Sequence, residues 1–314
     1  MLSSLSSRPL VLTPFFFAAL LLVQTPLFAE EVDTSEFVRV RYSEKVPTRA
    51  IAMDTAVVHF EAKSGNKDAA TVDLIGAIHI ADAEYYEKLN KLFSEYDVVL
   101  FELVAEEGTR LDPKVTAQSK ESPGLIGGMQ NGFADLLKLE HQLHHIDYTV
   151  KNMLHADMEP EVFMKRMVGE GEMAKIFSRV MMQSLNQSSS QSDKTAGRMI
   201  GSLFAARDKS LGLKRVFAAE MCRQIEDQLW IFEGDEGSTL IRERNGCALA
   251  KLRKVIHRGE KKIAIFYGAA HLYNFCDQLE KEFDMKPVKV TWVKAWDMGE
   301  NGELRQNGNL DEKY

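Results

Sequence analysis

The chain has 314 residues, of which 45% are hydrophobic and 27% are charged. This is the composition of a globular protein, and it excludes a collagen-like, coiled-coil or wholly disordered chain. Lysine and arginine number 39 while aspartate and glutamate number 46, so the formal net charge is -7. That balance argues against a nucleic-acid-binding protein. The chain has 3 cysteines, which cannot form a disulfide framework because one of them is always left over.

The N-terminus has the pattern of a secretory signal peptide. Arg8 precedes the uncharged stretch Leu10–Phe28, and Ala29 then comes before two acids. This order predicts cleavage near Ala29, removal of residues 1–29, and export to the periplasm or the extracellular space. An uncleaved membrane anchor is the alternative, because the uncharged stretch is close to the length that spans a bilayer. Two prolines interrupt its helical part, which favours the cleaved signal and a mature chain without a membrane span.

Residues 37–103 are predicted to form four strands and one helix. Alternating or continuous apolar runs predict strands at residues 37–42, 56–62, 71–75 and 97–103. Turn residues over Lys63–Asp68 indicate a hairpin between the second and third of these strands. Asp82 is expected to cap a helix that ends near Ser94.

The middle of the chain predicts helices. From about Pro113 to His257 the sequence has helical periodicity and few strand signals. We interpret its methionine-rich faces as a helix-packing core rather than a binding groove. The polar segment 186–193 is expected to be a flexible loop. Ser238 or Thr239 is expected to cap a helix that ends at His257.

The end of the chain returns to the opening pattern, with strands predicted at 262–267 and 288–293 around a helix at 272–283. Residues 299–314 are polar and are expected to form a loose tail. The sequence therefore predicts one α/β domain over residues 30–298. Two repeated βαβ-type units would form its central mixed sheet, with a helical insertion over about 113–257 between them.

A short motif occurs once in each predicted unit. Gly76-Ala-Ile-His79 and Gly268-Ala-Ala-His271 both follow an apolar strand and precede a helix. Glycine allows a sharp turn at the end of a strand, and open α/β sheets bind ligands at the carboxyl ends of their strands. If the two units are related by a pseudo-twofold axis, both histidines can point into one cleft.

Glu102 is the third candidate, at the end of the apolar strand 97–103. A carboxylate in an apolar strand costs several kcal/mol when it is unpaired, so we expect a cation, a metal or a strand-end histidine beside it. His79, Glu102 and His271 could bind a divalent metal with open positions. Without a metal, they could act as a general base and its orienting acid. The alternative is purely structural: Glu102 pairs with an arginine, and both histidines only cap loops.

Several further polar residues are candidates, but their spacing is not specific for one function. On the predicted helix, Arg242 and Asn245 are three apart and share a face, whereas Arg244 points elsewhere. Either arginine could clamp an anionic group or pair with a carboxylate, although a solvated charged face is the simpler interpretation. His141 and His145 are four apart, a spacing that can hold a metal but more often reflects packing. Asp157 is expected to cap the helix that follows it.

These motifs resemble those of the TraB/PrgY/GumN family and the related Tiki proteases, in a larger group with erythromycin esterase-like and ChaN-like members. The resemblance rests on Gly76–His79 and Gly268–His271, supported by Glu102 and by the segment 243–245. These motifs bracket residues from about 71 to 295, which is most of the mature chain.

The resemblance implies a two-repeat α/β core with a helical insertion. It also implies a shared cleft that holds His79, Glu102, Arg244, Asn245 and His271. In the Tiki branch such a cleft supports metal-dependent peptide hydrolysis, with manganese or cobalt as the implied metal. In the esterase branch it works by His/Glu base chemistry, and in the ChaN-like branch binding of a ligand such as haem is proposed.

The leading hypothesis is an exported hydrolase, a metal-dependent peptidase that acts on a peptide or small molecule. Glu102 with His79 or His271 would hold the metal or activate water, and the remaining histidine would stabilise the oxyanion or protonate the leaving group. Arg244 and Asn245, or Arg242, would position the substrate. The alternatives are a non-catalytic ligand-, haem- or peptide-binding protein and a metal-free esterase.

Overall fold

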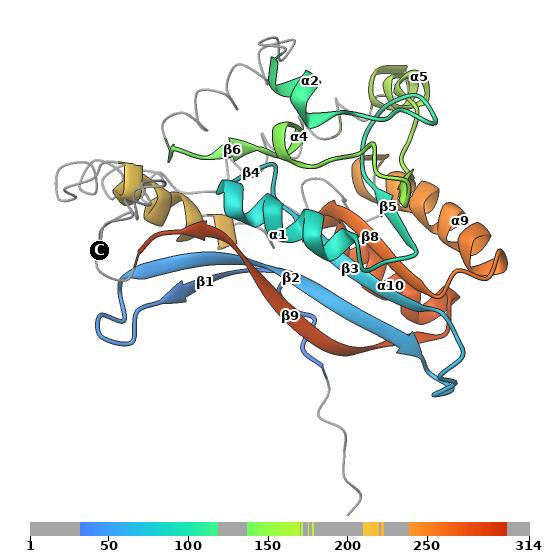
Figure 1. Cartoon of the computed structure of the whole chain (residues 1–314), viewed down its shortest axis with the longest axis horizontal. Helices are drawn as coiled ribbons and strands as arrows, with labels where there is room; N and C mark the ends of the chain where they lie inside the picture. The colour runs from blue at the N-terminus through green and yellow to red at the C-terminus, as the bar shows by residue number, and fades with distance from the viewer. Residues whose placement is uncertain are drawn as a thin grey trace, which may run out of the picture. The chain divides into compact units, whose positions relative to one another are not determined.

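A mixed seven-stranded sheet forms the centre of this computed structural model (Figure 1). The structure describes residues 32–118, 137–169, 210–219 and 239–299, together with residues 171, 175, 178, 221 and 222. The strands of the sheet are β1 (Val38–Tyr42), β2 (Ala50–Ala62), β3 (Thr71–Ala77), β5 (Val98–Phe101), β7 (Met153–His155), β8 (Lys262–Gly268) and β9 (Met285–Asp297). A separate small sheet pairs β4 (Ile80–Ala81) with β6 (Glu140–His141).

Helices flank the sheet and follow several of its strands. They are α1 (Ala83–Phe93), α2 (Pro113–Gln118), α4 (Gln142–His145), α5 (Pro160–Met164), α9 (Arg244–His257) and α10 (Leu272–Glu282). Three shorter turns accompany them: the π-helical η1 (Lys165–Gly169) and η2 (Thr239–Glu243), and the 3₁₀-helical η3 (Ala269–His271). In the part of the chain that the structure describes, no helix combines the length and apolar character that crossing a membrane requires.

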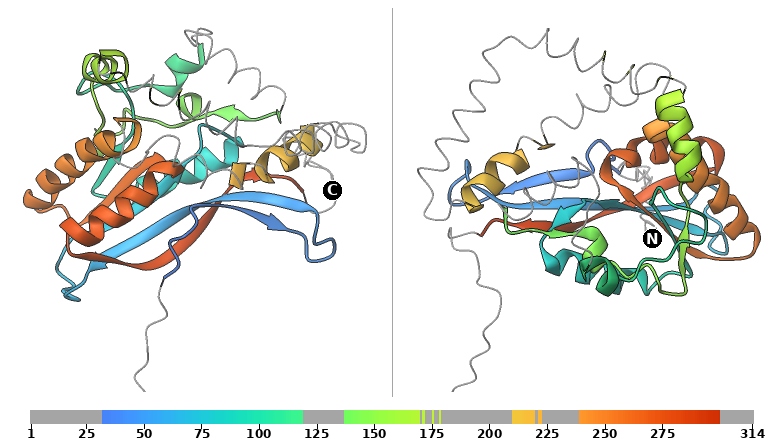
Figure 2. Two further views of the ribbon diagram at one scale, coloured as in Figure 1. Left: turned by 180° about the vertical axis from the view of Figure 1, so that it is seen from behind. Right: turned by 90° about the horizontal axis from the view of Figure 1, so that it is seen from above.

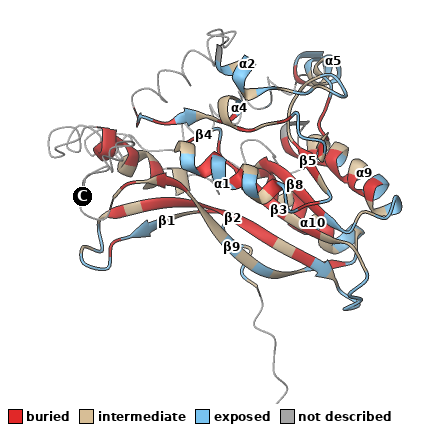
Figure 3. Cartoon of the chain, in the orientation of Figure 1, coloured by how far each residue is buried: buried red, intermediate tan, exposed pale blue. Residues whose placement is uncertain are grey.

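The sheet has an antiparallel half and a parallel half. In the antiparallel half, β2 pairs with β9 along one edge and with β1 and then β3 along the other. In the parallel half, β8 lies between β3 and β5, and β7 lies on the far side of β5. The inner parallel strands are continuous apolar runs because both of their faces are covered. β2 is buried along most of its length (Figure 3).

The two Gly-x-x-His motifs lie on neighbouring parallel strands, where Ala77 is in register with Gly268. Helices α1 and α10, which follow these strands, cover opposite faces of the sheet (Figure 2). This is the arrangement that the predicted pseudo-twofold repeat requires. Gly76 faces α10, and a Cβ atom on it would lie only 3.3 Å from the carbonyl oxygen of Ala56 and 3.4 Å from a methyl group of Leu272. A side chain at position 76 would therefore crowd these neighbours, whereas glycine fits.

The predicted α/β class is confirmed, and the predicted strands all lie on observed ones. Those at 37–42, 71–75, 97–103 and 262–267 correspond to β1, β3, β5 and β8. The predictions at 56–62 and 288–293 cover only parts of β2 and β9. These two strands are longer because each continues to pair with the other beyond the parallel half of the sheet.

Two local predictions are confirmed only in part. The segment 113–257, for which few strand signals were found, contains β7, which pairs with β5 in the main sheet. Asp82 stands at the N-terminus of α1 but makes no side-chain capping bond there. Its carboxylate instead binds Lys214 Nζ at 2.7 Å and the backbone N–H of Asp297. The Lys214 side chain is almost fully buried, so this ion pair ties the helical residues 210–219 to the sheet.

Three predictions lie outside the described residues. They are the signal peptide over residues 1–29, the polar loop over 186–193, and the tail over 299–314 apart from its first residue.

Candidate functional site

The carboxyl ends of the four parallel strands bring the candidate residues together. His79 follows β3, Glu102 follows β5, Asp157 follows β7, and His271 follows β8. These strands are neighbours in the sheet although all three connections between them in sequence are long. This is the position at which open α/β sheets place their ligands.

Glu102 is at the centre of the site. Its Oε1 accepts a hydrogen bond from Nη2 of Arg244 at 2.7 Å, and its Oε2 accepts one from the backbone N–H of Gly268 at 2.6 Å. Nε2 of His271 lies 3.6 Å from the same Oε1. Burial raises the pKa of Glu102, but the electrostatic interactions with His271, Arg244 and His79 and the hydrogen bond from the Gly268 N–H outweigh burial and lower the pKa to about 2. Glu102 is therefore ionised at neutral pH.

Arg244 is held by two carboxylates. Its Nε donates to Oδ1 of Asp157 at 3.0 Å, and its Nη2 donates to Oδ2 of Asp157 at 2.6 Å and to Glu102. The Asp157 side chain is fully buried, so its charge depends on this bidentate pair. Burial lowers the pKa of Arg244, but the hydrogen bonds that it donates to Asp157 and the two negative charges raise it further than burial lowers it. The guanidinium is thus a permanent cation of fixed orientation.

His271 is oriented by Asn245. Nδ1 of His271 lies 2.6 Å from Oδ1 of Asn245, whose Nδ2 donates to the backbone oxygen of His271 and to Oδ1 of Asn274, each at 3.0 Å. Because Nδ2 of Asn245 already faces two acceptors, its Oδ1 must accept, and the proton of the neutral imidazole lies on Nδ1. Burial lowers the pKa of His271 to about 4, although the charge of Glu102 opposes this shift. His271 is therefore neutral at pH 7, with a free lone pair on Nε2 that faces Glu102.

His79 is oriented in the same way by a different amide. Its Nδ1 lies 3.2 Å from Oε1 of Gln142, and Nε2 of Gln142 donates to the hydroxyl of Tyr148 at 2.8 Å. The backbone N–H of Gln142 also donates to the backbone oxygen of His79 at 2.9 Å. A proton on Nδ1 of His79 would be accepted by Oε1 of Gln142 and would leave Nε2 free. His79 is exposed whereas His271 is buried, so the two related histidines differ in access to solvent.

A cavity of about 350 Å³ opens beside this cluster. It is lined by His79, Glu102, Leu103, Val104, His141, Gln142, Leu143, His144 and Arg244. His271 is not among the lining residues, and its Nε2 lies 3.6 Å from Oε1 of Glu102, which is. A volume of this size admits a small molecule or a short peptide segment.

The structure brings together five of the six predicted site residues: His79, Glu102, Arg244, Asn245 and His271. The predicted helix register is wrong, because Arg244 rather than Arg242 lies beside Asn245 at the site and Arg242 is exposed. The π-helical turn η2 ends at Glu243 and α9 begins at Arg244, so the 3.6-residue spacing does not continue from Arg242 into α9. Asn245 has no exposed surface and binds His271, a contact that the sequence did not reveal.

Two residues of the site are not predicted from the sequence, and a third has another role than the one predicted. Gln142 and His144 carry no motif of their own. Asp157 was expected to cap a helix, yet the residue at the N-terminus of α5 is Glu159, and Asp157 binds Arg244 instead. The position of Asp157 just after a short strand was the available signal. Of the histidine pair four apart, only His141 lines the cavity; His145 stacks on Tyr86.

The donor types at the site suit a divalent metal, since two imidazole Nε2 atoms and one carboxylate are available. In the arrangement described, however, each oxygen of Glu102 already accepts an N–H bond, and the charge of Arg244 opposes a second cation beside it. Among the described residues, no three His, Cys, Asp or Glu side chains lie close enough together to hold a metal ion. The metal implied by the resemblance therefore stays a prediction.

Comparison of the chain with models of protein families, with curated proteins and with solved structures found no match. Membership of the TraB/PrgY/GumN family therefore also stays a prediction.

Proposed function

We propose that the chain is a hydrolase that acts on a peptide or an ester-containing small molecule in the cavity beside Glu102. One observation carries the proposal. Nδ1 of each motif histidine lies within hydrogen-bond distance of a side-chain amide oxygen, that of Gln142 for His79 and that of Asn245 for His271, so that each ring can donate its Nδ1–H and keep a free Nε2 next to an ionised carboxylate. Such orientation of an imidazole by a second group is typical of general bases and of metal-ligating histidines.

His79 is the general base in this proposal because it is exposed and lines the cavity. Its Nε2 removes a proton from a water molecule as that water attacks the substrate carbonyl, and the imidazolium returns this proton to the leaving amine or alcohol when the tetrahedral intermediate collapses and the C–N or C–O bond breaks. Glu102 stabilises the imidazolium that forms, since its negative charge is close enough to interact with His79. His271 is a positioning residue that holds Glu102 from the buried side.

Arg244 stabilises the developing oxyanion. Its Nε and Nη2 atoms bind carboxylates, but its Nη1 makes no hydrogen bond with the described residues, and Arg244 lines the cavity. A donor that is already oriented requires no reorganisation when charge develops on the substrate oxygen. The bidentate bond to Asp157 provides this orientation.

The finer proposal, metal-dependent peptide hydrolysis, comes from the family resemblance. A divalent ion such as manganese or cobalt would supply Lewis-acid activation of water. His79, Glu102 and His271 are the residues that would hold it.

The test is hydrolysis of a panel of fluorogenic peptides and nitrophenyl esters. His79→Ala and Glu102→Gln are expected to lower kcat/KM by about 100-fold or more, the usual contribution of a general base and its partner. His257→Ala is the matched control, because His257 is exposed at the end of α9, away from the cavity. Undiminished hydrolysis by folded His79→Ala and Glu102→Gln proteins would overturn the proposal.

The same assay after exhaustive chelation distinguishes the two chemistries. Full activity without metal supports the acid–base mechanism. Loss of activity that manganese or cobalt restores supports the metallopeptidase. Tight binding of a peptide or haem without turnover of any substrate would instead favour the non-catalytic alternative.

We also propose that the protein is exported after cleavage next to Ala29, on the pattern of its first residues. Mass spectrometry of the protein from the exported fraction should give a mature chain that begins at Glu30. A chain that retains residues 1–29 in the membrane fraction would contradict this.

A further inference from the structure

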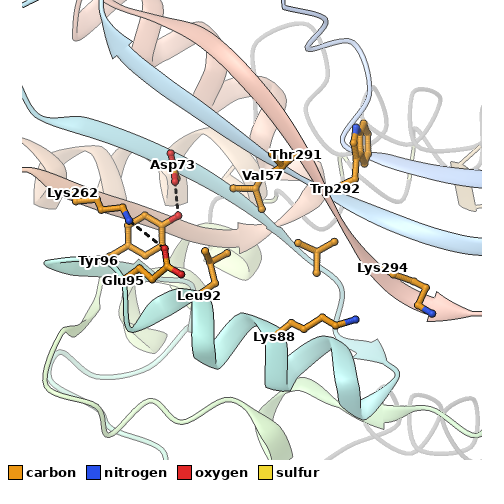
Figure 4. Close-up of a pocket in the computed structure, with 11 residues that line it drawn as sticks. Val57, Asp73, Lys88, Leu92, Glu95, Tyr96, Lys262, Thr291, Trp292 and Lys294 are labelled. Atoms are coloured by element: carbon orange, nitrogen blue, oxygen red, sulfur yellow. Dashed lines mark hydrogen bonds and ion pairs between the residues drawn. The ribbon is translucent and has the colours of Figure 1, made fainter. Parts of the chain in front are cut away.

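A second and larger cavity, of about 510 Å³, lies between α1 and the antiparallel half of the sheet (Figure 4). Its walls come from α1 and the residues just after it, from β9, and from single residues of β2, β3 and β8. The lining residues are Val57, Asp73, Lys88, Leu92, Glu95, Tyr96, Lys262, Thr291, Trp292, Val293 and Lys294. No residue of the candidate hydrolase site is among them, so we call this cavity the α1–β9 groove.

One end of the α1–β9 groove is closed by polar side chains that satisfy one another. The hydroxyl of Tyr96 donates to Oδ2 of Asp73, whose Oδ1 binds Nδ1 of His59. Nζ of Lys262 lies 3.4 Å from Oε2 of Glu95 and 5.1 Å from the centre of the Tyr96 ring. Glu95 offsets the charge of Lys262, and the carboxylate of Asp73 is satisfied by hydrogen bonds but keeps its negative charge, so this end has little attraction for an anionic ligand.

The middle of the groove is apolar. Val57 and Val293 come from paired strands, and Leu92 faces them from α1. Apolar walls with a few polar groups at defined positions are typical of small-molecule sites, and a volume of about 510 Å³ lies in the usual range for them.

The other end of the groove carries two lysines, and because Lys294 pairs with Asp297, its excess positive charge among the lining residues is that of Lys88. Lys88 reaches it from α1 and Lys294 from β9, and Figure 4 shows both side chains away from the Tyr96–Asp73 pair. Lys88 makes no ion pair with any of the described residues, whereas Lys294 pairs with Asp297 at 2.5 Å. Two ammonium groups next to an apolar wall favour a ligand that is anionic at one end and apolar along its body. They also stand out in a chain whose formal net charge is -7.

We propose that the α1–β9 groove binds a single-chain carboxylate amphiphile, such as a medium-chain fatty acid. The carboxylate lies between Lys88 and Lys294, and the hydrocarbon chain packs along Val57, Leu92 and Val293. This binding is independent of the proposed hydrolase activity, because the two cavities share no residue.

The test is calorimetric titration of the folded protein with dodecanoate and with dodecanol, each below its aggregation concentration. The wild-type protein is expected to bind dodecanoate at least about 10-fold more tightly than the uncharged alcohol. Lys88→Glu and Lys294→Glu should each weaken dodecanoate binding by about 10-fold or more while leaving dodecanol binding unchanged. Lys289→Glu is the matched control, because Lys289 is exposed on the same strand but does not line the groove.

A second variant tests the apolar wall without a change of charge. Val293→Trp places a larger side chain in the middle of the groove and should abolish binding of both ligands. Three results would overturn the proposal: no binding of dodecanoate, equal binding of the acid and the alcohol, or an equal loss in Lys289→Glu. Undiminished dodecanoate binding by Val293→Trp would also overturn it, because the chain would then lie elsewhere.

Discussion

Nδ1 of His271 donates its proton to Oδ1 of Asn245 across 2.6 Å, and this bond determines which nitrogen of the ring is basic. The two residues are neighbours at the end of β8 and the start of α9. Since Nδ2 of Asn245 faces two other acceptors, the amide cannot be turned around without losing both of those bonds. Nε2 of His271 is therefore left to face Glu102, and Gln142 plays the same part for His79.

Replacing Asn245 should separate positioning from simple stability. Asn245→Leu removes the acceptor and should lower kcat about 10-fold or more, with little change in KM, because the imidazole loses its fixed tautomer. Asn245→Asp keeps an acceptor and adds a negative charge, so it should raise the pKa of His271 and shift the acid limb of the pH–rate profile upward. Identical pH profiles for Asn245→Asp and the wild type would contradict this role.

Removing Arg244 should destabilise the fold. Arg244→Met leaves the buried Asp157 without its cation and Glu102 without one of its donors, so the free energy of unfolding should fall by about 3–5 kcal/mol. Urea denaturation measures this. Lys254→Met, an exposed cation of the same helix, is the control and should change stability by less than about 0.5 kcal/mol. A loss of less than about 1 kcal/mol in Arg244→Met would show that the network is not held by this residue.

Stability should fall in acid in two steps. The pKa of His271 is lowered from 6.5 to about 4 in the folded protein, so the unfolded chain binds a proton first as the pH drops below 6.5. This stabilisation is complete above pH 6.5 and is lost as the pH falls toward 4, on the order of 3 kcal/mol in total. The lowered pKa of Glu102 adds a second loss, from about pH 4.5 toward 2.

Denaturant titrations at half-unit steps of pH measure these losses. His271→Gln should flatten the dependence between pH 6.5 and 4.5, whereas His257→Gln should leave it as in the wild type. A wild-type curve without slope in that interval would contradict the buried neutral state of His271.

The ion pair between Lys214 and Asp82 should stabilise the fold, because it holds the helical residues 210–219 against the rest of the domain. Lys214→Ala leaves the carboxylate of Asp82 without its cation and creates a cavity in the core, so we expect a loss of about 3 kcal/mol or more. Lys214→Met keeps most of the side-chain volume but removes the charge, so it should lose less stability than Lys214→Ala. Equal stability of Lys214→Ala and the wild type in urea would contradict a stabilising role of this ion pair.

Local sequence patterns determined most of the secondary structure and the chemistry of the motifs. Continuous apolar runs marked β5 and β8, and glycine before each histidine marked the turns at the ends of two strands. The sequence also identified Glu102, because an acid at the end of an apolar strand needs a partner. These features depend on neighbours along the chain, so periodicity and turn chemistry reveal them.

Only the tertiary structure decided which partners meet. Sheet order brings β7 beside β5 and so places Asp157 opposite Arg244, although the two residues are far apart in sequence. The irregular turn before α9 directs Arg244 rather than Arg242 toward Glu102. The side-chain amides that orient the two histidines belong to Gln142 and Asn245, which lie in elements that share no sequence pattern. Periodicity specifies the face that an element buries, but not the long-range pairing of strands or the hydrogen bonds made across it, and these contacts determine the site.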